Sequence, residues 1–163
     1  MIGVLSPDEI EALLRRQHVG RLGCVVDGRA YVVPITYAYA DGCVYAHTLP
    51  GRKLAALRAD PRACFEVDAR DGTCWRSVVA EATFEEIADE RERQAILARL
   101  AGAVPVAVPV AVPGVVFRLR LTAASGRFVE QDPALLLTDV DAALLGLGLR
   151  AGDDRNWPTS GDA

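Results

Sequence analysis

Hydrophobic and β-branched residues gather in short runs that turn residues separate, a pattern typical of antiparallel strands. The first three runs extend from Arg21 to Asp27, from Ala30 to Tyr39 and from Cys43 to Thr48, with Asp27-Gly28 and Asp41-Gly42 between them. Asp-Gly pairs readily adopt the left-handed conformations that tight hairpin turns require. The first part of the chain therefore predicts an antiparallel meander.

Three further strands are predicted at Arg62 to Ala69, at about Cys74 to Glu85 and at Val115 to Glu130. Three helices are predicted. The first begins at a capping box, Ser6-Pro7-Asp8-Glu9, and ends at Gly20; the second is short and extends from Arg52 to Ala59; the third begins at Asp89 to Glu92. Six antiparallel strands with flanking helices predict a mainly β fold that closes into a barrel, because closure removes exposed strand edges.

The length of 163 residues predicts one domain over residues 1–150, followed by a polar and flexible tail over 151–163. One or two short helices are expected to begin at Asp132-Pro133 and at Thr138 to Asp141. A Val-Pro-Val-Ala repeat fills residues 104–113, where a proline every four residues forbids a regular helix or a central strand. This repeat is predicted to be an extended connector packed on the barrel or on a partner.

Composition narrows the function classes. The net charge is −4 with no basic stripe, which argues against nucleic acid as a partner. No apolar run reaches the roughly 20 residues of a membrane span, and the start of the chain lacks a basic signal-peptide region. The four cysteines do not have the spacing of a zinc site. The sequence therefore predicts a cytoplasmic protein with neither a membrane span nor a metal centre.

Residues suited to binding a cofactor concentrate in three segments, namely Tyr31 to Tyr37, Ala46 to Lys53 and Trp75 to Val79. In the first, Pro34 has no N–H to donate to a neighbouring strand, so it marks an edge, a bulge or a place where something other than a strand approaches.

The second segment holds a candidate phosphate site. Thr48 ends a strand, Gly51 follows in a tight turn, and Arg52 and Lys53 open a helix. A helix N-terminus attracts anions, and the two cations and the hydroxyl add donors suited to phosphate. The alternative is that Arg52 and Lys53 form the solvated first turn of a surface helix. Their placement opposes the helix dipole, and a bound anion would offset that cost.

These segments together resemble the pyridoxamine 5′-phosphate oxidase-like split barrels, and within them the nitroimidazole-resistance-like proteins. The resemblance rests on the order and spacing of short motifs from about Gly20 to Glu86, with a weaker match through Val115 to Glu130. The motifs are Val33-Pro34-Ile35-Thr36-Tyr37, Tyr45-Ala46-His47-Thr48, Gly51-Arg52-Lys53-Leu54, Asp60-Pro61 and Trp75-Arg76-Ser77-Val78.

The resemblance implies a six-stranded antiparallel split β-barrel that forms a homodimer, with one flavin mononucleotide (FMN) at each of two subunit interfaces. The implied cofactor contacts are the backbone of Val33, Pro34, Ile35 and Thr36 along the isoalloxazine ring, His47 and Thr48 near the ring or ribityl chain, Arg52 and Lys53 at the phosphate, and Ser77 with Arg76 from a neighbouring strand. Members of this kind also bind haem or a deazaflavin instead.

The expected function is that of a flavin-dependent oxidoreductase acting on a small planar acceptor such as a nitroaromatic or quinone, with a reduced nicotinamide as transient donor. Related vitamin B6 chemistry is a second substrate class, although Arg150 to Ala163 lacks the C-terminal arginine motif that grips a B6 phosphate. Three alternatives stay open: a haem or flavin carrier or sensor with His47 as ligand, a deazaflavin-dependent reductase, and a barrel that has lost its cofactor. The sequence assigns no catalytic residue.

Overall fold

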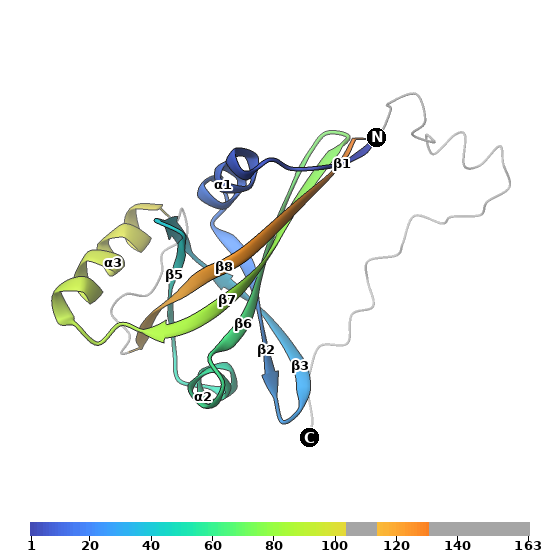
Figure 1. Cartoon of the computed structure of the whole chain (residues 1–163). Helices are drawn as coiled ribbons and strands as arrows, with labels where there is room; N and C mark the ends of the chain where they lie inside the picture. Colours follow the sequence, from blue (N-terminus) through green and yellow to red (C-terminus); the bar gives the residue numbers. More distant parts are fainter. Residues whose placement is uncertain (104–113, 131–163) are drawn as a thin grey trace, which may run out of the picture. The chain divides into compact units, whose positions relative to one another are not determined.

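The computed structural model describes residues 1–103 and 114–130 (Figure 1). The elements in chain order are β1 (Ile2–Val4), α1 (Pro7–Arg16), β2 (Val19–Val26), β3 (Arg29–Thr36), β4 (Ala38–Ala40), β5 (Cys43–Thr48), α2 (Arg52–Ala59), β6 (Arg62–Asp71), β7 (Cys74–Glu86), α3 (Glu90–Ala103) and β8 (Val115–Glu130). The Val-Pro-Val-Ala repeat, the predicted C-terminal helices and the predicted tail lie outside the described residues.

One antiparallel sheet holds the described strands in the order β3-β2-β6-β7-β8-β5-β4, with β1 pairing to β8. The six predicted strands are all present, and two three-residue strands, β1 and β4, add to them. The second addition corrects the prediction of one strand from Ala30 to Tyr39, because the chain leaves the ladder at Tyr37 and divides this run into β3 and β4.

The division at Tyr37 closes the sheet. β3 and β4 stand at opposite ends of the strand order, yet this single residue joins them. The two edges of the sheet must therefore meet, so the sheet curls into a barrel with a split between β3 and β5. The fold is the predicted split barrel, and Pro34 lies on an edge strand, which was one of the three positions expected for it.

The turns and the first helix follow local sequence chemistry. Asp27, Gly28, Asp41 and Gly42 all have positive φ angles, between 50° and 73°, as the hairpin prediction requires. The capping box of α1 is present, since Ser6 and Glu9 bond each other's backbone N–H groups. The helix ends at Arg16, however, and not at Gly20. Gly20 belongs to β2, where a Cβ would lie 2.4 Å from the Phe65 ring.

Two apolar clusters lie on opposite faces of the sheet. The larger one fills the barrel, where inward-facing strand residues such as Phe65 and Phe117 meet Leu13 and Leu14 of α1 and Leu54 of α2. The smaller one packs α3 against the outer side of the sheet over β4, β5 and β8. Among the described helices, none is long and apolar enough to cross a membrane.

Replacing Tyr37 by Phe tests the closure. The Tyr37 side chain is fully buried, its hydroxyl donates to the Leu14 carbonyl oxygen at 2.9 Å, and its ring meets Phe65 edge-on. Tyr37→Phe leaves that buried carbonyl without its partner, so we expect the free energy of unfolding to fall by about 1–2 kcal/mol in denaturant titration. The half-buried Tyr39→Phe serves as the control. An equal effect of the two substitutions would contradict a special role for Tyr37.

Candidate functional site

The split between β3 and β5 gathers one group of the predicted site residues. The β4–β5 register pairs Ala38 with Tyr45, and its extension would place Thr36 opposite His47 and Ile35 opposite Thr48. β3 pairs with β2 instead, so these positions face each other without forming a ladder. Backbone donors and acceptors along this edge of β3 therefore have no strand partner among the described residues.

The N-terminus of α2 lies three residues beyond the end of β5. Gly51 occupies the N-cap position, supplies no side-chain hydrogen bond and has open space where a Cβ would stand. The first turn of α2 contains cations and no acidic residue. α1 and α3 differ, because Ser6 and Asp89 cap them and acidic residues fill their first turns. The first N–H groups of α2 are thus left for an external acceptor.

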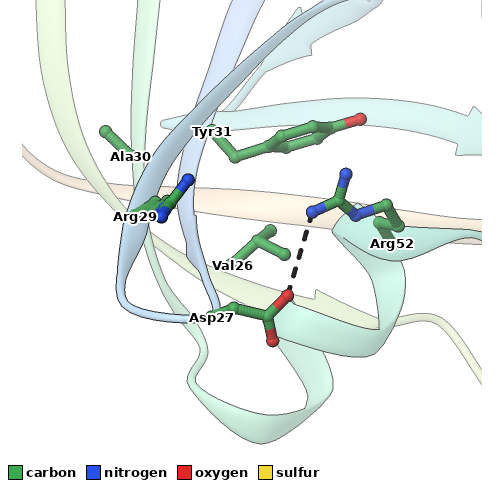
Figure 2. Close-up of a pocket in the computed structure, with 6 residues that line it drawn as sticks. All are labelled: Val26, Asp27, Arg29, Ala30, Tyr31 and Arg52. Carbon is green, nitrogen blue, oxygen red and sulfur yellow. Dashed lines mark ion pairs between the residues drawn. The ribbon is translucent and has the colours of Figure 1, made fainter.

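Figure 2 shows a pocket of about 370 Å³ between this helix end and the turn that joins β2 to β3. Its lining residues are Val26, Asp27, Arg29, Ala30, Tyr31 and Arg52. The Arg52 guanidinium lies over the Tyr31 ring at 5.5 Å from the centroid and 3.8 Å from a carboxylate oxygen of Asp27. Arg52 is therefore held across the pocket mouth by an aromatic face and a weak, exposed ion pair.

Lys53 is near enough to Cys24 of β2 for its charge to act on the thiol. Burial raises the pKa of the Cys24 thiol, and the nearby Lys53 charge acts against that rise. Cys24 and Tyr31 are cross-strand partners. Arg52, which the sequence pairs with Lys53 as a phosphate ligand, thus contacts the hairpin at Tyr31, and the Lys53 charge acts on the cross-strand partner Cys24.

Thr48 and His47 point to opposite faces of β5, because they are consecutive in a strand. Thr48 is buried, and its hydroxyl donates to the Leu49 carbonyl oxygen at 3.1 Å. His47 packs on the other face, where a Cβ on Gly114 would stand 2.3 Å from its Nε2 atom. Burial, together with the nearby Arg93 charge, lowers the pKa of His47 from 6.5, which favours the neutral imidazole at neutral pH.

Arg76 and Ser77 lie away from this group. Ser77 pairs with Asp68, and the β2–β6 register, in which Arg21 faces Glu66, extends to place Asp68 level with Val19. Val19 is seven residues along β2 from Val26 at the pocket, so Ser77 lies about 23 Å from it in the strand direction. Ser77 is on the outward side of β7, where it is buried. Arg76 faces the side of α1, where hydrogen bonds with Ser6 lower the pKa of Glu9 and the Arg76 charge adds to that effect. The structure of this single chain does not bring all the predicted residues together.

Of the six pocket residues only Arg52 was predicted as a binding residue, and the polar ones that were missed are Asp27, Arg29 and Tyr31. Asp27 was interpreted only as a turn residue. Tyr31 began a segment suited to cofactor binding, but only Val33 to Thr36 of that segment were assigned as cofactor contacts. The sequence did carry a signal for them. The Asp27-Gly28-Arg29 turn places an acid and a cation next to each other in a tight hairpin, and such a pair beside the cationic start of a helix could have been considered as part of one site.

Exposed apolar side chains occupy one outer face of the sheet. Cross-strand partners share a face, and the registers place the outward residues of β1, β2, β3 and β7 together. Trp75 and Val79 are 39% and 46% exposed there. The full set is Ile2, Val4, Val19, Val25, Val32, Trp75 and Val79. No helix of the described part of the chain covers this outer face over β2, β3 and β6.

The fold and the motifs agree with comparisons of the sequence. The sequence profile described as pyridoxamine 5′-phosphate oxidase matches residues 6–128, and the chain belongs to this family. A curated relative, the uncharacterised protein RA0666 of Rhizobium meliloti (strain 1021), is 29% identical over 87 residues. The match covers 53% of this chain and 58% of that protein, so the chain spans less than two thirds of the relative's length.

Solved structures confirm the split barrel. A FAD-binding protein from Mesorhizobium loti is 35% identical and superposes with a TM-score of 0.68, over 80% of this chain and 99% of that one. A proposed 5-nitroimidazole antibiotic resistance protein from Bacteroides thetaiotaomicron VPI-5482 shares the fold at 18% identity and a TM-score of 0.67, over 78% of this chain and 87% of that one. The resemblance to the pyridoxamine 5′-phosphate oxidase-like family that the motifs predicted is confirmed, and the Bacteroides structure shows that the fold is shared with a protein of the nitroimidazole-resistance kind.

Proposed function

We propose that this chain binds a flavin through its mononucleotide part at the split of the barrel. The observation that carries the proposal is the uncapped start of α2, where N–H groups, Arg52 and Lys53 converge beside the unpaired edge of β3. Helix ends of this kind bind phosphate. The free backbone groups of Val33 to Thr36 suit the donor and acceptor edge of a flat heterocycle. The FAD-binding description of the Mesorhizobium loti relative supports a flavin.

The donor set fits the mononucleotide. Arg52 offers a planar fork, Lys53 a point charge, and the helix start its N–H groups, which together match the oxygens of a phosphate. Thr48 ends β5 between the split and the helix, where the chain of a ribityl group would run. The bound flavin supplies the redox chemistry, while these residues hold and orient it.

Removing both cations tests the phosphate contact. For Arg52→Ala combined with Lys53→Ala, we expect the affinity for FMN to fall roughly 100-fold, because two charge-assisted contacts are lost. Affinity for riboflavin, which lacks the phosphate, should change by less than about twofold. Fluorescence titration measures both.

The control is Arg15→Ala combined with Arg16→Ala, an adjacent pair of cations at the C-terminal end of α1. This control should leave both affinities unchanged. Equal loss of FMN and riboflavin in the Arg52 and Lys53 variant would show that the pair does not hold the phosphate.

We also propose that the protein is a homodimer, with a second copy covering the outer apolar face. Exposed apolar side chains gathered on one face are typical of an interaction site, and the Arg21 ion pairs with Glu66 and Asp68 lie among them on this face. The predicted residue Ser77 and its neighbour Trp75 lie on this face, far along the strands from Arg52 of the same chain. A second copy seated on the face brings these residues next to a flavin that is held by another protomer, so the site is completed by dimerisation.

A charge on the outer face tests the dimer. For Val79→Glu, we expect sedimentation to report a monomer, because an unpaired carboxylate is costly to bury in an interface. Flavin affinity should fall about tenfold or more with it. The control, Ala98→Glu on the exposed side of α3, should remain dimeric. A wild-type protein that is monomeric and still binds flavin tightly would rule out the shared site.

The proposed activity is that of an oxidoreductase. A reduced nicotinamide gives a hydride, and a small planar acceptor such as a quinone leaves as the hydroquinone after taking up two electrons, with the second proton coming from solvent. A nitroaromatic is an acceptor of the same class. No side chain of this chain is assigned a proton transfer.

Turnover tests the activity. The flavin-loaded protein should oxidise reduced nicotinamide in the presence of p-benzoquinone about tenfold faster than the same concentration of free flavin. The rate is followed by nicotinamide absorbance, with the Arg52 and Lys53 double variant as the control. A loaded protein no faster than free flavin would contradict an enzymatic role and favour a carrier.

A further inference from the structure

Gly23 is a glycine that the fold of its own chain does not require. It lies in the middle of β2, where a glycine weakens the strand because it has no side chain to pack. Its φ angle is not positive, and a Cβ there would meet Cys64 and Val32 at ordinary contact distances of 3.5 Å and 3.9 Å. Gly20 differs, because a Cβ there would overlap the Phe65 ring. A strand glycine without such a reason indicates a place where another molecule approaches the backbone closely.

The missing side chain opens a groove of about 430 Å³ on the outer face of the sheet. Gly23, Ala30 and Cys64 are its small outward residues, and they come from the adjacent strands β2, β3 and β6. Val25 and Val32 stand beside them and are 58% and 63% exposed. The lining also includes three charged residues, namely Arg21, Arg62 and Glu66. A groove with a low floor and apolar sides is suited to a large, flat apolar side chain.

Trp75 is the largest exposed apolar side chain of the same outer face. Cross-strand partners lie at the same level of the sheet, so Trp75 is level with Arg70 of β6, whereas Gly23 is level with Cys64. These two levels are six residues apart on β6, or about 20 Å, so Trp75 cannot reach the groove of its own chain. Its indole N–H donates to Asp68 at 3.4 Å, and the ring can therefore be buried without leaving an unpaired donor.

We propose that Trp75 of each copy inserts into the Gly23 groove of the other copy when the chain dimerises. In a two-fold dimer, a contact between two different positions of one face occurs twice, so both grooves are filled. The inference rests on the homodimer proposed above and specifies the contact that sets its geometry. The two-fold axis then crosses the strands between the two levels, close to the row formed by Arg21, Glu66 and Val79.

The charges of the outer face are complementary in this arrangement. Glu81 and Arg127 are exposed, and neither takes part in an ion pair within the described part of the chain. Glu81 lies on β7 at the level of the groove, and Arg127 lies on β8 two residues from the level of Trp75. Because the axis exchanges the two levels, it brings Glu81 of one copy opposite Arg127 of the other. Near the axis, each Arg21 meets the carboxylates of both copies.

Filling the groove tests the contact in the full chain. Gly23→Val should fold, because a Cβ has room there and valine favours strands; circular dichroism checks this. We expect the dimer dissociation constant from sedimentation equilibrium to rise about 100-fold, since the added side chain takes the place of the indole. Trp75→Ala should raise it by a similar factor. The two substitutions remove the same contact, so the double variant should also show a rise of only about 100-fold.

Ala98→Val, on the exposed side of α3, is the control and should leave the dissociation constant unchanged. A Gly23→Val variant that dimerises like the wild type, or a double variant whose loss is the product of the two single losses, overturns the Trp75 contact and leaves the homodimer standing. A monomeric wild-type protein overturns the contact together with the homodimer. Flavin binding is tested separately, by the FMN affinity of the Arg52 and Lys53 variant.

Discussion

A single residue, Tyr37, joins strands at opposite ends of the sheet, and the rest of the structure depends on this link. β3 and β4 stand at opposite ends of the strand order, and a one-residue link can join them only if the sheet curls until its two edges are adjacent. The buried Tyr37 side chain secures the junction through Leu14 of α1 and the Phe65 ring. Among the described strands β3 then pairs with β2 alone, so closure leaves a split with an unpaired backbone edge, which is where the proposed flavin would lie.

The same geometry explains where charge is placed. β5 ends at the split and the chain turns at Gly51 into α2, whose first turn holds two cations where the helix dipole disfavours them. This placement costs stability unless an anion is bound, and the phosphate of the proposed flavin would offset that cost. Arg52 is further positioned by the Tyr31 ring and by Asp27. The candidate site thus consists of two locally encoded elements, a hairpin turn and a helix start, which barrel closure brings together.

Much of this could be predicted because it is encoded locally. The bounds of α2 matched the expectation from Arg52 to Ala59, and both Asp-Gly turns formed as expected, since each depends on neighbouring residues alone. The break at Tyr37 could not be predicted, because the apolar run from Ala30 to Tyr39 is continuous and only non-local pairing divides it. Strand register also decides which face a residue occupies. The register places His47 on the face of Gly114 and Arg93. It places Arg76 on the side of α1 and Ser77 on the opposite, outward side of β7.

The absorption spectrum of the purified full chain, after incubation with FAD and removal of free cofactor, tests the central claim most directly. The account predicts flavin absorption bands that stay with the protein at about one flavin per chain, as the uncapped start of α2 and the unpaired edge of β3 require. A colourless protein after this treatment would contradict the claim. A Soret band in place of flavin bands would equally contradict it and would assign the cleft to haem.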